Sequence, residues 1–506
     1  MKNTVFADKV YDYCTGKGLL AGVSCIVAGL SGGPDSVALV CALKELYDSG
    51  RITPKIAAVH VNHGLRESAD DDEQLAVSLC GRLGIPCKTV RYDVKDEARK
   101  MGRGLEETGR ILRYRAFDEY AQEISGTMGI GLPGVRIATA HHKGDLTETF
   151  LMNLFRGSGL EGLTAMSSDP RIIRPLLTMS KKEILGYLED TGTEYALDET
   201  NLESDVTRNK WRNDIIPAIA GVSVKDPEDA VCDTYSLLSR DADYLSRTSE
   251  EAYGKCLVKA GKCLLLNTSG VLGLHRAIGT RVVRRLWQDT FGNLTDFETK
   301  HTDIVMGLME LTDGTKSADL SFGRTAVVHN GYLGFYEGDG TAMACAMAVN
   351  SGFLAVPAAF EYQISVRELE ESSQTLQLPC SDLVIKASVV ENSEPMVYNT
   401  FSWICEARDL IIGLCPADGD FRKAGSPHQA RIRKLMSDLK VPKDAREHLL
   451  AVKSDDTILW IPGIGHSEGF VSSGSRSNWL KEDGNASVKK LVRLDILNEG
   501  QTGETF

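Results

Sequence analysis

The chain has 506 residues, of which 42% are hydrophobic and 25% are charged, and its net charge at neutral pH is −13. This length exceeds one ordinary hydrophobic core, so we expect two to four domains. No apolar run reaches the roughly 18 to 20 residues of a membrane span. The acidic balance argues against a general nucleic-acid-binding surface, although a local basic face can still meet phosphates.

The cysteines and the first residues indicate the compartment. The twelve cysteines are scattered without the density of a disulfide scaffold, and no C-x-x-C pair occurs. The segment MKNTVFADKVYDYC lacks the apolar core of a signal peptide. We therefore expect a protein of the reducing cytoplasm with no membrane partner.

From residue 21 to about 160, strand-like runs alternate with helical ones. VSCIVAGL is a continuous apolar run of the buried parallel-strand type, and DSVALVCALKELYDSG follows with helical periodicity. Such alternation predicts a doubly wound α/β domain with a parallel sheet, in which ligands bind beyond the carboxyl ends of the strands. Three polar strings fall at these ends, namely SGGPDS, HVNHGLR and TAHHKGD.

Three domains follow from the rest of the pattern. Helices that end near residue 218 close the α/β domain, 1–218. A mainly helical domain is predicted over 219–345; it contains the hairpin-like KSADLSFGRTAVVHNGYLGFYE. Short strands and the basic helix PHQARIRKLMSDLK predict a small α+β domain over 346–506.

The string SGGPDS stands between a buried strand and a helix, and it comprises Ser31, Gly32, Gly33, Pro34, Asp35 and Ser36. Its glycines let successive backbone N–H groups converge on an anion at a helix N-terminus. Asp35 can reach a magnesium ion held by phosphates. The P-loop lysine pattern is absent. A tight turn capped by Ser36 is the alternative interpretation.

SGGPDS resembles the pyrophosphate loop of the N-type ATP pyrophosphatases, which split ATP into AMP and pyrophosphate. Further strings over about residues 21–218 resemble the tRNA(Ile)-lysidine synthetases within that superfamily, and the match is looser beyond. These strings are HVNHGLRESADDDEQ, GLEETGRILRYRAF, TAHHKGDLTETFLMNLFRGSGLEGLTAM, IIRPLLTMSKKEI and DETNLESDVTRNKWRNDIIP. One departure is Gly144, where the family usually carries the first of two adjacent aspartates.

The resemblance implies ligation of free L-lysine to the wobble cytidine of a tRNA(Ile) with a CAU anticodon. ATP, with Mg²⁺, adenylates the carbonyl oxygen at the 2-position, and the lysine amine displaces AMP. The two distal domains would bind tRNA, and a second copy of the chain (a homodimer) is a further candidate partner. A tRNA thiolase and a non-catalytic, ATP-sensing tRNA-binding protein are the alternatives.

The candidate site residues follow from these strings. Asp145 and Glu148 share a helix face, as do Arg110 and Arg113. We assign catalytic roles to these four residues and to Asp35. The alternatives are an acidic first helical turn for the former pair and a solvated ion-pair face with Glu106 for the latter. We assign His63 to ATP and expect no histidine metal site. Arg66, Arg208 and Arg212 are candidate tRNA contacts. Ordinary surface arginines are the alternative for Arg208 and Arg212, and a contact with phosphate or only with Asp70 is the alternative for Arg66.

A basic segment lies late in this acidic chain. From Arg422 to Lys453 there are nine Lys or Arg residues against three acids, a local balance of 9 − 3 = +6. Such a segment is the electrostatic footprint expected for an RNA backbone. We assign tRNA binding to Arg431, Arg433 and Lys434; a solvated helix face is the alternative.

Overall fold

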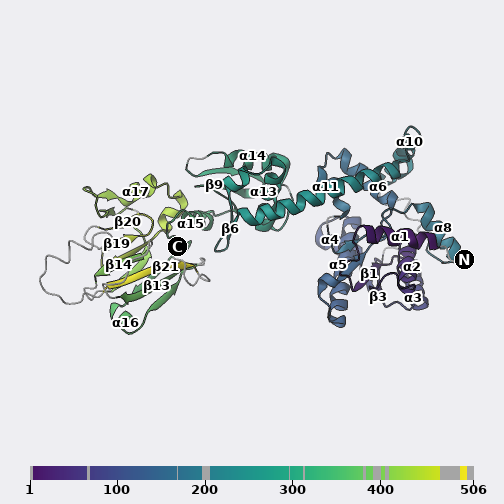
Figure 1. Ribbon diagram of the computed structural model, residues 1–506, viewed down its shortest axis with the longest axis horizontal. Helices are drawn as coiled ribbons and strands as arrows, with labels where there is room; N and C mark the ends of the chain where they lie inside the picture. Colours follow the sequence, from purple (N-terminus) through teal and green to yellow (C-terminus); the bar gives the residue numbers. More distant parts are fainter. Residues whose placement is uncertain are drawn as a thin grey trace. The chain divides into compact units, whose positions relative to one another are not determined.

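The computed structural model describes residues 4–64, 69–167, 169–196, 206–295, 297–311, 314–379, 383–390, 400–404, 409–416, 418–467 and 491–498. By contact, the chain divides into two compact units, Met1–Tyr244 and Leu245–Phe506 (Figure 1). The three domains expected from the sequence, with limits near 218 and 345, stay a prediction.

The first unit is built on a five-stranded sheet in which every pair of neighbouring strands is parallel. The order is β3-β2-β1-β4-β5, so β1 lies between β2 and β4. The strands are β1 (Cys25–Gly29), β2 (Lys55–Asn62), β3 (Cys87–Arg91), β4 (Val135–Ala138) and β5 (Ile172–Ile173). This arrangement confirms the predicted doubly wound α/β domain.

Helices cover both faces of this sheet, which explains why its central strands are continuously apolar. Ile26 and Ala28 of β1 pack with the α2 side chains, whereas Val27 packs with Phe117 and Tyr120 of α5. The helices are α1 (Thr4–Gly16), α2 (Pro34–Asp48), α3 (Ala69–Leu83), α4 (Val94–Met101), α5 (Leu105–Met128), α6 (Lys143–Phe155), α7 (Leu160–Leu163), α8 (Lys181–Thr191), α9 (Val206–Lys210), α10 (Ile216–Ala220) and α11 (Pro227–Cys256). A π-helical turn, η4 (Trp211–Ile215), joins α9 to α10, and α11 continues into the second unit.

The second unit begins with an antiparallel sheet of order β6-β7-β10-β9-β8. Its strands are β6 (Leu257–Ala260), β7 (Cys263–Asn267), β8 (Lys316–Asp319), β9 (Arg324–His329) and β10 (Tyr332–Glu337), with helices α12 (Thr268–Leu272), α13 (Arg276–Phe291), α14 (Thr299–Met309) and α15 (Thr341–Asn350). The fully buried Trp287 of α13 stacks on Phe297 at a centroid distance of 4.2 Å and meets Phe335 edge-on. The predicted hairpin corresponds to β8, β9 and β10.

Two further sheets share one hydrophobic core in the C-terminal part of this unit. One has the order β11-β15-β18-β19-β20, the other β12-β13-β21-β14, and β16 pairs with β17 apart from both. The strands are β11 (Glu361–Ile364), β12 (Gln374–Gln377), β13 (Leu383–Val390), β14 (Thr400–Ile404), β15 (Leu410–Leu414), β16 (Asp420–Phe421), β17 (Ala430–Arg431), β18 (Leu450–Ser454), β19 (Thr457–Ile461), β20 (Gly465–His466) and β21 (Leu491–Asn498), with helices α16 (Val366–Glu371) and α17 (Ile432–Asp438). The expected α+β character is confirmed.

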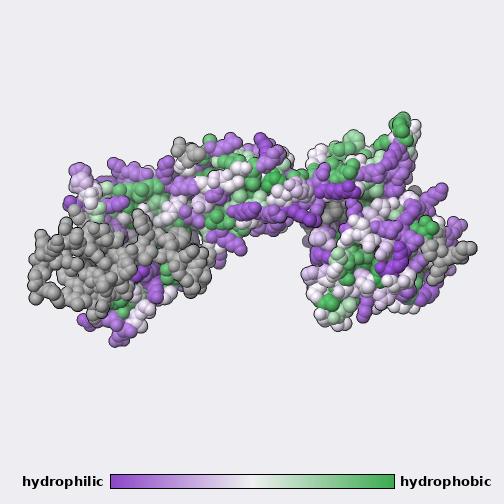
Figure 2. Space-filling view, viewed as in Figure 1, coloured by the Kyte–Doolittle hydropathy of each residue, from purple (hydrophilic) through white to green (hydrophobic). Residues whose placement is uncertain are grey.

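The surface is mainly polar on the face that Figure 2 shows, where hydrophilic side chains spread along both units and are interrupted by smaller hydrophobic areas. Within the part of the chain that the structure describes, no helix has both the length and the apolarity needed to cross a membrane.

A buried histidine makes the second unit sensitive to acid. His329 of β9 is fully buried, shares a 2.9 Å hydrogen bond with Thr315, and has its pKa lowered to about 4 by burial. The unfolded chain binds the proton near pH 6.5, so the stability contributed by neutral His329 is present above that pH and is lost as pH falls towards 4.

We expect the free energy of unfolding, measured by chemical denaturation, to fall between about pH 7 and 5, and to fall less in His329→Gln. His428→Gln is the control, because His428 is exposed. Identical pH slopes for wild type and His329→Gln would contradict this prediction.

Candidate active site

The loops that follow β1 and β4 meet at one edge of the sheet. These two strands are parallel neighbours, and the chain leaves them in different directions because β2 lies on the other side of β1. Such a switch point in the strand order forms a crevice at the carboxyl ends, where open α/β sheets bind ligands. SGGPDS follows β1, whereas His141, His142, Asp145 and Glu148 follow β4.

The phosphate loop is held open by its own hydroxyls and by a left-handed glycine. Gly32 has a φ of +90°, which favours glycine, and its carbonyl accepts a hydrogen bond from Ala196 N–H. Ser36 is buried; its hydroxyl donates to the Gly33 carbonyl and accepts from Ser31 N–H. Gly33 is the N-cap residue of α2, and no side chain forms a capping hydrogen bond there. The first N–H groups of α2 therefore face the loop.

Lys181 adds a cation to this loop that sequence reasoning missed. It is the first residue of α8, and its Nζ donates to Asp35 Oδ1 at 2.6 Å. A capping box between Ser180 and Glu183 fixes the start of α8 and therefore the position of Lys181. The string SKKEI lay within a family block, but no local pattern connects it to Asp35.

The turn after β4 explains the unusual glycine at position 144. His142 caps α6 by accepting Gly144 N–H at Nδ1, and its own N–H donates to Asp145 Oδ2 at 3.0 Å. A Cβ at position 144 would stand 2.8 Å from His142 Cε1 and 3.3 Å from Glu228 Oε1. With His142 as the cap, the aspartate that the resemblance leads one to expect does not fit without a shift of these side chains.

Asp145 and Glu148 lie together, and one guanidinium bridges them. Arg212 Nε donates to Glu148 Oε1 at 2.5 Å, and its Nη2 is 3.6 Å from Asp145 Oδ1. The Glu148 side chain is only 3% exposed. Arg212, expected as a tRNA contact, is therefore engaged with the two carboxylates.

The two carboxyls differ in acidity. Burial raises the pKa of Glu148, although Arg212 opposes that shift. Burial also acts to raise the pKa of Asp145, but the neighbouring histidines, the His142 N–H and Arg212 hold it below the usual range. Burial lowers the pKa of His141 to about 4 against the pull of Asp145, so this imidazole is neutral at physiological pH. Carboxyls whose pKa values are pushed apart suit different tasks in proton transfer.

Arg110 and Arg113 of α5 are exposed and, among the described residues, neither forms an ion pair. Glu106, the partner expected on their own helix face, instead lies 3.5 Å from Arg208 of α9. Arg110 stacks over Tyr114 with its guanidinium carbon 4.9 Å from the ring centroid. The ion-pair alternative is therefore not what holds these two arginines, which are available to an anionic ligand.

The two remaining predicted site residues are His63 and Arg66. His63 is half-buried and packs beside Gly109 of α5, so it lies next to the arginine helix. Arg66 lies outside the described residues. Within those residues, no cluster of three His, Cys, Asp or Glu side chains is placed to hold a metal ion.

The late basic residues are solvent-exposed around a short helix. Ile432 and Met436 of α17 enter the core, while Arg431, Arg433 and Lys434 are exposed, and Arg433 lies 3.5 Å from Asp418. The predicted helix over 427–440 is shorter than expected, because residues 430 and 431 form β17.

Known protein families match two parts of this chain. A PP-loop domain model matches residues 5–219, and a model of the TilS substrate C-terminal domain matches residues 410–482. A tRNA(Ile)-lysidine synthase of Caldanaerobacter subterraneus is 29% identical over 90% of this chain and 92% of its own length. One of Clostridium tetani is 28% identical over 90% and 93%, respectively. Among solved structures, the U34-tRNA thiolase NcsA of Methanococcus maripaludis aligns over 47% of this chain and 79% of its own, at 22% identity and a TM-score of 0.38.

The sheet order, the loop after β1 and the matched domain define a PP-loop ATP pyrophosphatase. Within that class, the chain belongs to the tRNA(Ile)-lysidine synthase family, because the TilS substrate C-terminal domain accompanies the PP-loop domain and the likeness to those synthases extends over nine-tenths of its length.

We expect Lys181→Met to raise the Kd for ATP about tenfold, because a charge-assisted hydrogen bond to a phosphate is worth roughly 1.5–3 kcal/mol. Lys182→Met, one residue further and exposed, is the matched control. Titration calorimetry with ATP and Mg²⁺ measures both. An unchanged Kd for Lys181→Met would remove Lys181 from the nucleotide site.

Proposed function

We propose that this enzyme ligates L-lysine to the 2-position of the wobble cytidine in a tRNA(Ile) with a CAU anticodon, releasing AMP and pyrophosphate. The observation that carries the proposal is the convergence, at one sheet edge, of a phosphate loop and two carboxyls of different acidity in a chain of this family. ATP, tRNA and free lysine are available in the cytoplasm, where we place the protein.

In the first step, the cytidine carbonyl oxygen attacks the α-phosphate of ATP and pyrophosphate leaves. The N–H groups at the start of α2, with the Ser31 and Ser36 hydroxyls, would hold the pyrophosphate portion, and Lys181 would add a cation. Arg110 and Arg113 are exposed and lack carboxylate partners among the described residues, which suits them to the charge that develops on the α-phosphate.

In the second step, the lysine amine attacks the activated carbon and AMP leaves. Asp145, whose pKa is held low, would hold the ammonium group of lysine. Glu148, whose pKa is raised, is the better proton acceptor as the C–N bond forms. Arg212 would have to yield part of its contact with these carboxylates to the incoming ammonium.

The donor set near the loop suits a magnesium ion that is held mainly by phosphates. Asp35 is a half-buried carboxylate of the loop itself, and Mg²⁺ usually binds through one or two carboxylates plus phosphate oxygens and water. Bound there, the ion would neutralise charge on the leaving pyrophosphate.

The thiolase alternative needs a reactive cysteine, and the thiol on the helix that follows the phosphate loop does not favour it. Of the ten described cysteines, seven are buried and three are half-buried. Burial raises the pKa of Cys41, in α2, to about 11, which is the opposite of an activated thiol.

The decisive assay combines purified protein, ATP, Mg²⁺, radiolabelled lysine and an unmodified isoleucine tRNA transcript. We expect AMP and pyrophosphate to form and label to enter the RNA, and Asp35→Ala to lower the rate about 100-fold or more. Glu148→Gln should reduce lysine transfer more than pyrophosphate release; Glu189→Gln, an exposed acid on α8, is the control. ATP cleavage without lysine incorporation would favour a thiolase, and no turnover would favour a binding protein.

The exposed basic residues around α17 support a role in docking the tRNA backbone. We expect the triple change of Arg431, Arg433 and Lys434 to alanine to weaken tRNA binding and to lower the slope of log K against log salt by about 2 to 3. Substituting Lys259 and Lys262, exposed lysines elsewhere in this unit, is the control. A salt slope that the triple change leaves intact would assign tRNA docking to another surface.

A further inference from the structure

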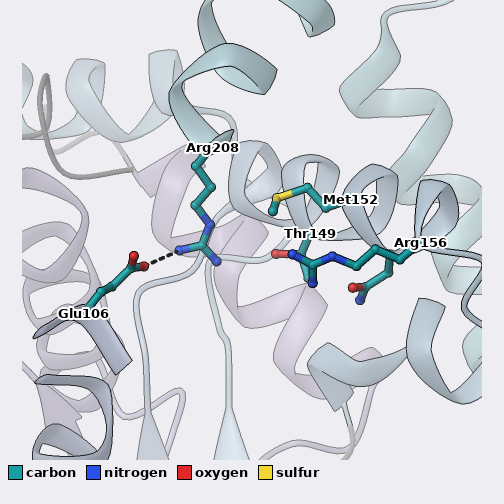
Figure 3. A pocket seen from close by; sticks show the side chains of 6 residues that line it. Glu106, Thr149, Met152, Arg156 and Arg208 are labelled. Atoms are coloured by element: carbon teal, nitrogen blue, oxygen red, sulfur yellow. Dashed lines mark ion pairs between the residues drawn. The ribbon is translucent and has the colours of Figure 1, made fainter. Parts of the chain in front are cut away.

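An open pocket of about 230 Å³ adjoins the carboxylates of the candidate active site. It belongs to the first unit and is lined by residues of α5, α6 and α9, namely Glu106, Thr149, Met152, Asn153, Arg156 and Arg208. Figure 3 shows Arg208 reaching from α9 towards Glu106, and Arg156 extending along α6 towards Thr149. Neither step of the proposed reaction uses this pocket.

The pocket carries an excess of positive charge. Its one carboxylate, Glu106, lies 3.5 Å from Arg208, while Arg156 forms no ion pair with any residue that the structure describes. Two guanidiniums against one carboxylate leave a net charge of +1. The planar fork of arginine suits a phosphate.

Two aromatic rings stand next to the pocket in sequence and against each other in space. Phe155 precedes Arg156, and Trp211 follows Arg208 by three residues. Their ring centroids are 5.4 Å apart at an angle of 34°, and Phe155 is 72% exposed. A phenyl group this exposed leaves much apolar surface in water unless a ligand covers it. Trp211 also begins the π-helical turn, a rare geometry that is frequent at functional sites.

The pocket and the active-site carboxyls share the same two elements. Met152 of α6 lies one turn beyond Glu148, and Arg156, the C-cap residue of α6, lies two turns beyond it, which is about 6 and 12 Å along the axis. Beside α6, Arg212 contacts Glu148, and Arg208 lies four residues earlier. An RNA strand whose base reacts at Asp145 and Glu148 would therefore bring the neighbouring nucleotide to this pocket.

We propose that the pocket and the aromatic pair bind the nucleotide that flanks the reacting cytidine in the single-stranded anticodon loop. Its base stacks on Phe155 and Trp211, and its phosphate lies between Arg156 and Arg208. Aromatic stacking with arginine contacts is how proteins hold splayed bases of single-stranded RNA. This inference rests on the proposed function, because it takes tRNA as the substrate.

The test compares Phe155→Ala with Phe322→Ala, whose side chain is 71% exposed in the other unit. We expect Phe155→Ala to raise the Kd for the tRNA transcript about tenfold, since stacking of one base is worth roughly 1–3 kcal/mol. Phe155→Trp should restore binding, and the KM values for ATP and lysine should not change. Thermal melting confirms that each variant is folded.

A second measurement identifies the nucleotide. Transcripts with an abasic residue on either side of the wobble cytidine are titrated against wild type and Phe155→Ala. One abasic transcript should weaken wild-type binding about tenfold and Phe155→Ala binding little further, which is the signature of a shared contact.

Each contrary result has a distinct meaning. Full tRNA affinity in Phe155→Ala would overturn the inference while leaving the proposed function intact. A raised KM for lysine with unchanged tRNA binding in Arg156→Ala would mean that the pocket holds the amino acid and would also overturn it. Absence of lysine incorporation by the wild type would instead reject the proposed function.

Discussion

The parallel pairing of β1 with both β2 and β4 is the constraint on which the site depends. It places the ends of β1 and β4 side by side while their following helices start from opposite sides of a crevice. The N-terminus of α2 can then face a polyphosphate, and α6 can present Asp145 and Glu148 to the substrate that reacts with this polyphosphate. Pairing β1 with β3 instead would keep every motif intact and destroy the site.

Cations from distant segments balance the acids around this crevice. Asp35 meets Lys181, Glu148 meets Arg212, and Glu106 meets Arg208. Other arginines, on α5 and at the end of α6, have no carboxylate partner in the described structure. A protein of net charge −13 thus presents a locally positive cleft, and such local fields rather than the total charge attract anionic substrates.

Structural features that depend on local sequence pattern could be predicted. Apolar runs predicted the buried parallel strands, and the glycines of SGGPDS predicted the turn that leads from β1 into α2, because both follow from backbone geometry within a few residues. Pairs between distant segments could not be predicted. The i, i+4 rule suggested Glu106 as the partner of Arg110, yet the fold brings Arg208 to it. The basic helix predicted over 427–440 begins only at Ile432, because residues 430 and 431 form β17.

The π-helical turn at Trp211–Ile215 links two parts of the site to one backbone irregularity. A π turn holds one residue more than an α turn, so it changes which way consecutive side chains face. Trp211 thereby meets Phe155 while Arg212, its neighbour, meets Glu148. In evolutionary terms, inserting a single codon into an α-helical ancestor creates such a turn. The aromatic contact and the ion pair can therefore be gained, or lost, in one genetic event.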